Sequence, residues 1–125
     1  MKLRYPTVEG VKILQQLLID RFGGEYALRD AGALESALMR PQTGYYGDIV
    51  EEAAALMESL VNNHPFIDGN KRTAFFTIDA FLRANGYYIE CDNDAAYAFF
   101  VGLFETGAFN FGNLEKWIRE KIKPL

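Results

Sequence analysis

The only histidine in the chain, His64, opens a short segment whose residue types suit phosphate chemistry. The segment reads HPFIDGNKRTA, so a carboxylate, an amide and two cations follow the imidazole closely. Histidine gains and loses a proton near neutral pH, and anionic phosphates bind cations and free backbone N–H groups. These residue types in this order predict an active site that handles phosphate groups.

A purely structural interpretation explains part of this segment. His64–Pro65 could end one helix, and Asp68–Gly69 could make the turn into the next. Turn geometry gives no reason for the amide and the two adjacent cations of Asn70–Arg72 at the start of an apolar helix. The functional interpretation therefore explains more of the segment.

Each side chain can be given a role from the geometry of a helix start. Unpaired N–H groups around Asn70, Lys71 and Arg72 would form an anion pocket at the positive end of the helix dipole. Arg72 can hold two phosphate oxygens in its plane, Lys71 adds a point charge, and the Asn70 amide adds one hydrogen bond. Asp68 is an oxygen ligand suited to Mg²⁺. His64 would then act as general base towards an incoming hydroxyl group.

Composition excludes several other classes of protein. The 125 residues, half of them hydrophobic, fit a single domain spanning residues 1–125. The 13 basic and 17 acidic residues give a net charge of −4, which argues against direct nucleic-acid binding. One cysteine and one histidine allow neither an intramolecular disulfide nor a Cys/His zinc site. Without a signal-peptide pattern or a long apolar stretch, we expect a cytoplasmic protein without membrane contact.

Hydrophobic periodicity predicts an all-α fold of six helices. The first five are expected over residues 8–22, 31–40, 48–63, 70–84 and 95–106. A sixth would begin at Asn113 and place Ile122 inward, and residues 87–91 form a brief extended piece. The expected N-caps are Thr7, Asp30, Asp48, one of residues 92–94, and Asn113. The phosphate-handling segment therefore joins the third helix to the fourth.

Aromatic residues at helical spacing are assigned to the core rather than to a stacking platform. They are Phe75, Phe81, Phe99, Phe100, Phe104 and Trp117. Tyr45 and Tyr46 lie in the loop of residues 42–47, where they could form a lid or a docking surface, or simply pack against the body of the protein.

The segment from His64 resembles the motif of the Fic family, and more closely that of its death-on-curing (Doc) toxins. The resemblance extends over nearly the whole chain and implies a compact six-helix Fic/Doc fold. Its further landmarks are Arg21–Gly24, Asp30 with Gly32, Arg40–Gln42, Ala53–Leu56 and Phe81–Tyr87. By resemblance, Phe66 and Gly69 shape the loop, and Gly69 joins Asn70, Lys71 and Arg72 in binding the nucleotide.

The resemblance also implies an activity. Doc toxins act as protein kinases that use ATP and Mg²⁺ to phosphorylate elongation factor Tu and stop translation. His64, Asp68 and Arg72 would be the catalytic residues, with Asp68 as the metal ligand. Two positions differ from the adenylyl-transferring Fic enzymes: Lys71 stands where those have glycine, and Phe75 where they have a second arginine. Both changes alter the phosphate-binding surface, so the nucleotide should bind differently.

The resemblance further implies a partner, because Doc toxins are paired with an antitoxin protein whose disordered tail folds into a groove on the toxin. The internal inhibitory helix of many Fic enzymes, Ser/Thr-x-x-x-Glu-Gly/Asn, has no counterpart in this sequence. Two alternatives stay open: a Fic-type transferase that moves AMP or UMP to a protein hydroxyl, and a binding module that has lost turnover.

Overall fold

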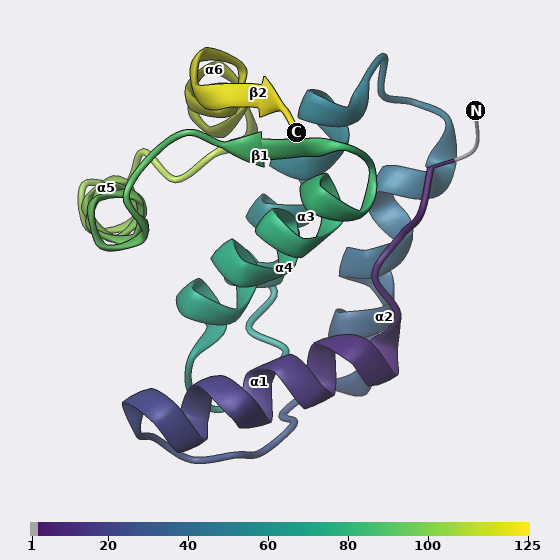
Figure 1. The fold of residues 1–125 in the computed structure, drawn as a ribbon. Coiled ribbons are helices and arrows are strands. Elements are labelled where there is room, and N and C mark those ends of the chain that lie inside the picture. The colour runs from purple at the N-terminus through teal and green to yellow at the C-terminus, as the bar shows by residue number, and fades with distance from the viewer. Residues whose placement is uncertain (1–2) are drawn as a thin grey trace.

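The computed structural model describes residues 3–125, which form six α-helices, one 3-10 helix and a two-stranded antiparallel sheet (Figure 1). The elements are α1 (Val8–Phe22), α2 (Ala31–Met39), η1 (Arg40–Thr43), α3 (Ile49–Asn62), α4 (Asn70–Ala84), β1 (Tyr87–Ile89), α5 (Asn93–Glu105), α6 (Phe111–Lys121) and β2 (Ile122–Pro124). The all-α prediction is confirmed. No helix in residues 3–125 is long and apolar enough to cross a bilayer.

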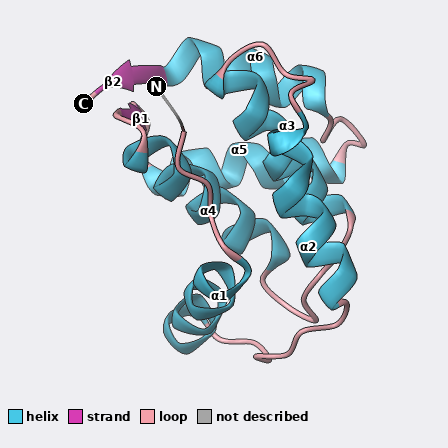
Figure 2. Cartoon of the chain, turned by 90° about the vertical axis from the view of Figure 1, so that its right-hand side faces the viewer, coloured by secondary structure: helices cyan, strands magenta, loops and turns pink. Residues whose placement is uncertain are grey.

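The helices α3 and α4 form the centre of the molecule. α3 packs against α2, α4 and α6, while α1 packs against α4 (Figures 1 and 2). Three consecutive alanines of α3, Ala53–Ala55, are completely buried, and such small side chains let neighbouring helices approach closely. The loop that joins α3 to α4 is thereby held between two well-packed helices.

Side-chain caps fix the starts of most helices, as the sequence predicted. Thr7, Asp30, Asp48 and Asp92 each accept a hydrogen bond from a backbone N–H in the first turn of α1, α2, α3 and α5. The predicted cap of the last helix was wrong, because Asn110 rather than Asn113 caps α6 and accepts its bond from the Asn113 amide. α6 consequently starts earlier than expected.

The C-terminal residues also differ from the prediction. Ile122 was expected on the inner face of the last helix, but it is the first residue of β2 and pairs with Ile89 of β1. The helix pattern was misleading here because strand pairing depends on where α4 delivers residues 87–89. Two boundaries moved slightly: α2 ends at Met39 before the 3-10 turn, and α5 begins at Asn93.

The aromatic core is largely as predicted. Phe75, Phe81, Phe100 and Trp117 are buried, and Phe104 is half-buried against the core. Phe99 is an exception, since it is 39% exposed and stacks on the outer side of Trp117.

The two tyrosines of the loop before α3 have different environments. Tyr46 packs against Phe111, and its hydroxyl accepts a hydrogen bond from Arg40. It therefore does not project from the protein as a lid would. Tyr45 is 83% exposed. The loop is thus anchored through one of its two rings.

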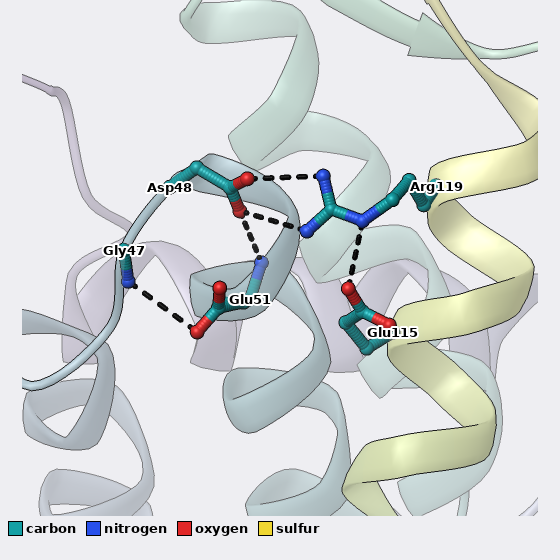
Figure 3. A network of polar contacts seen from close by, with 5 residues as sticks. All are labelled: Gly47, Asp48, Glu51, Glu115 and Arg119. Atoms are coloured by element: carbon teal, nitrogen blue, oxygen red, sulfur yellow. Dashed lines mark hydrogen bonds and ion pairs between the residues drawn. The ribbon is translucent and has the colours of Figure 1, made fainter.

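A polar network ties α6 to the start of α3 (Figure 3). The Asp48 carboxylate accepts from the Glu51 amide at 3.0 Å, and the Glu51 carboxylate accepts from the Gly47 amide at 3.3 Å. Arg119 reaches across from α6 to Asp48 at 3.0 Å and to Glu115 at 2.7 Å. Burial alone would raise the pKa of Asp48, but the hydrogen bonds from Arg119 and from the Glu51 amide outweigh it and lower this pKa below its ordinary value.

This lowered pKa makes the contribution of Asp48 to stability depend on pH. A carboxylate with a lowered pKa stabilises the fold above its ordinary pKa, and the contribution disappears as the pH falls through the lowered value. Asn at position 48 can still cap the helix but cannot pair with Arg119. We expect Asp48→Asn to lower the free energy of unfolding by about 0.5 kcal/mol at neutral pH, as for an exposed ion pair. Urea unfolding at pH 7 and pH 3 should show this deficit shrinking in acid; a deficit equal at both pH values would contradict the assignment.

Candidate active site

His64 directly follows the C-cap of α3 and has a backbone conformation that residues other than glycine rarely adopt. The cap residue is Asn63, and His64 has a φ of +47°. The position after a C-cap is where glycine is favoured, because a left-handed residue with a side chain is strained. The imidazole is exposed. A strained residue at an exposed loop position is a common sign of function rather than of packing.

The backbone around His64 is held by the linker between α1 and α2, residues 23–30. The Arg29 side chain donates from Nε to the carbonyl of His64 at 2.6 Å and from its terminal nitrogen to the carbonyl of Asn63 at 2.8 Å. The amides of Arg29 and Asp30 both donate to the carbonyl of Pro65. The linker therefore satisfies three consecutive carbonyl groups and fixes the loop from outside.

Phe66 anchors the middle of the loop, as predicted. Its ring is 2% exposed within the main core, and its backbone is bridged to Leu28 in the linker. The Asn70 side chain accepts from the Phe66 amide at 3.0 Å and donates to the Phe66 carbonyl at 2.9 Å. The Asn70 amide was expected to bind phosphate, whereas in this structure its oxygen and one N–H hold the loop.

Asp68 is exposed and is oriented by its neighbours. One carboxylate oxygen accepts from the Glu25 amide at 2.9 Å, and the Asp68 carbonyl accepts from the buried Gln15 side chain at 3.1 Å. A Cβ atom on Gly24 would lie 3.3 Å from the Asp68 Cβ and 3.0 Å from Ile19, so glycine allows this close approach. The second carboxylate oxygen is left for another ligand.

The start of α4 lacks the side-chain cap found on the other α-helices of residues 3–125. Its N-cap is Gly69, which has a φ of +77° and no side chain to offer. The first intrahelical bond runs from the Thr73 amide to the Gly69 carbonyl, so the N–H groups of Asn70, Lys71 and Arg72 precede the hydrogen-bonded turns. Such amides and the helix dipole favour an anionic ligand.

Both cations of the first turn of α4 rest on aromatic rings. The Arg72 guanidinium carbon lies 3.8 Å from the ring centroid of Phe22 and 4.1 Å from that of Tyr97. The Lys71 ammonium lies 4.1 Å from the ring centroid of Phe104. Neither cation is paired with a carboxylate of residues 3–125. The two cations were predicted from the sequence, but the rings beneath them were not.

Phe75, where the adenylyl-transferring enzymes have an arginine, is 2% exposed and packs against Phe76 and Phe100. It therefore contributes to the core and offers no contact to a phosphate group.

The loop thus brings the sequence-predicted residues onto one short stretch of backbone between α3 and α4. The residues that sequence reasoning missed are Arg29, Gln15, Phe22, Tyr97 and Phe104. Each acts across a long sequence separation, although Phe22 lies within the landmark Arg21–Gly24 and Arg29 immediately precedes the N-cap Asp30. No three His, Cys, Asp or Glu side chains of the described residues cluster as a protein-only metal site. Mg²⁺ needs only one or two carboxylates when phosphate oxygens complete its coordination, so the exposed Asp68 fits that role.

The sequence is similar to those of known proteins. A model of the Fic/DOC family matches residues 5–82. "Toxin Doc" of Mycolicibacterium smegmatis is 45% identical over 78 residues, which make up 58% of this chain and 60% of that relative. "Protein kinase doc" of Escherichia phage P1 is 31% identical over 91 residues, 70% of this chain and 72% of the relative.

The matched residues 5–82 run from the segment before α1 into α4, so they include the linker, the loop with its strained histidine and both cations. The family model covers more than half of the chain. The chain spans only 60% of the length of Toxin Doc. The chain belongs to the Fic/DOC family.

Proposed function

We propose that the protein transfers the terminal phosphoryl group of ATP to a hydroxyl group of a target protein. The observation that carries this proposal is the uncapped start of α4, where free amides and two cations adjoin the loop that presents His64. Amides, dipole and cations favour the phosphates of a nucleotide, and the imidazole supplies a base beside them.

The chemical step follows from these roles. His64 accepts the proton of the target hydroxyl, and the oxygen forms a bond to the terminal phosphorus. The bond from that phosphorus to the bridging oxygen breaks, and ADP leaves with the electron pair. Arg72 and Lys71 stabilise the charge that develops on the phosphate oxygens, which is the main catalytic contribution in phosphoryl transfer.

Mg²⁺ would be held by Asp68 together with phosphate oxygens and water. When bound, it would neutralise negative charge on the phosphate groups. Asp68 itself is preset by the Glu25 amide, so its carboxylate does not have to reorganise on binding.

Two features favour phosphoryl over nucleotidyl transfer. Lys71 fills the position of a glycine that would otherwise leave room at the inner phosphates, and Phe75 is buried where a second arginine would grip the outer ones. The phage relative bears the name of a protein kinase.

We further propose that the protein is the toxin of a bacterial toxin–antitoxin pair that works in the cytoplasm. The relative named Toxin Doc supports this role. The target would be elongation factor Tu, as the resemblance to Doc toxins implies, so that growth stops because translation stops. An antitoxin protein would supply control.

Position-specific labelling tests the reaction. The purified protein is incubated with elongation factor Tu, Mg²⁺ and ATP labelled at either the α or the γ phosphate. We expect label on the target from the γ position only, and none with the His64→Ala variant. Label from the α position would instead establish nucleotidyl transfer. If His64→Ala stopped growth as strongly as the wild type on induction, the protein would be a binding module rather than an enzyme.

A further inference from the structure

The helix α5 places two aromatic rings beneath the two cations of the candidate active site. Tyr97 stacks on Arg72 and Phe104 lies under Lys71, in each case at 4.1 Å from ring centroid to cation. The two rings are seven residues apart, which is two helical turns, so they project from the same face of α5. One helix therefore contacts both cations.

Arg72 lies over two rings. Its guanidinium carbon is 3.8 Å from the ring centroid of Phe22 at the end of α1 and 4.1 Å from that of Tyr97. Rings on the faces of a guanidinium leave its N–H groups, which lie in the plane, available to an acceptor at the edge. No ion pair in residues 3–125 uses that edge. This arrangement holds the side chain while leaving its bidentate donors available.

An unconstrained arginine or lysine loses considerable rotamer freedom when it binds a ligand, which weakens binding. Stacking removes part of that freedom before the ligand arrives. The rings of α5 lie beyond residues 5–82, the part matched by the family model, so this support comes from the C-terminal third of the chain.

We propose that Tyr97 and Phe104 are positioning residues, through which α5 presets Arg72 and Lys71 for the phosphate groups of the nucleotide. This inference rests on the proposed function for its ligand. It predicts that loss of a ring weakens nucleotide binding, and that it slows the transfer far less than loss of His64 does.

Calorimetric titration with Mg²⁺–ATP, together with steady-state kinetics, tests the inference. Tyr97→Leu removes the ring, and we expect the Kd for ATP and the KM to rise five- to tenfold. The kcat should fall as well, because Arg72 also stabilises the charge that develops in the transition state. Tyr97→Phe keeps the ring and should restore affinity to within about twofold. Phe99→Leu is the matched control, because Phe99 is on the same helix but stacks on Trp117, and its affinity should not change.

A second measurement reads the position of Arg72 without any nucleotide. In NMR spectra, the Nε–H group of Arg72 should show a ring-current shift that Tyr97→Leu reduces and Phe99→Leu preserves. Should the wild type bind no ATP, the proposed function fails, and this shift still decides whether α5 positions the arginine. If the wild type binds ATP and a folded Tyr97→Leu binds it equally well, or if the shift is the same in both, the inference is overturned. Phe104→Leu provides the parallel test at Lys71 should Tyr97→Leu not fold.

Discussion

Replacing His64 with glycine should abolish phosphoryl transfer and at the same time stabilise the fold. Removing a general base costs about two to four orders of magnitude in rate. The φ of +47° costs a residue with a side chain about 1–2 kcal/mol, and glycine adopts it freely. Glycine also gives up about 0.5–1 kcal/mol through the greater freedom of the unfolded chain. We therefore expect a net gain of up to about 1.5 kcal/mol, measured by urea unfolding beside the labelled-ATP assay.

The matched control is His64→Ala, which removes the imidazole but keeps the strain. It should be as inactive as His64→Gly and no more stable than the wild type, because the exposed imidazole makes no hydrogen bond to residues 3–125 that would be lost. A glycine variant less stable than the alanine variant would show that the backbone at this position is not strained. An active glycine variant would remove His64 from the mechanism.

Phe66→Ala should be the most destabilising change in the loop, and it should also disable the site. Its ring is 2% exposed, and truncating a buried phenylalanine costs about 3–5 kcal/mol. The ring fixes the loop that carries His64 and Asp68, and a displacement of about 1 Å at reacting groups can lower a rate about 100-fold. We expect such a loss of transfer at a temperature where the variant is still folded, as judged by circular dichroism.

Phe81→Ala separates the two effects. Phe81 is also 2% exposed, and it stacks on Tyr5 near the other end of α4, far from the loop. Its truncation should cost a similar free energy of unfolding while transfer by the folded protein stays within about twofold of the wild type. If both variants lost activity equally, Phe66 would matter only through global stability. Phe66→Leu offers a milder change if the alanine variant does not fold.

The sequence was a good guide wherever a signal was local. Caps such as Thr7 and Asp30 were recognised because an oxygen-bearing side chain immediately preceded an apolar repeat, and the structure confirms both. The same reasoning misplaced the start of α6, because Asn110 and Asn113 are both acceptable caps and the intervening Phe111 and Gly112 resemble a loop. Local patterns identify the kind of element more securely than its boundary.

Contacts between distant segments could not be predicted in the same way. Two such contacts are the pairing of Ile122 in β2 with Ile89 in β1 and the stacking of Tyr97 on Arg72. Both depend on how elements far apart in the sequence are arranged in space. Phe104 was assigned to the core on its spacing, although it also supports a cation of the site. The hydrogen bonds between the Asn70 side chain and the Phe66 backbone were not predicted either, although they span only four residues.

The linker of residues 23–30 completes the hydrogen bonding of a loop that lies far from it in the sequence. An insertion or a deletion between α1 and α2 would therefore disturb the position of the His64 imidazole without altering any residue of the motif. Genetic selection for inactive variants should accordingly return changes in this linker as well as in the motif, with Arg29 prominent among them.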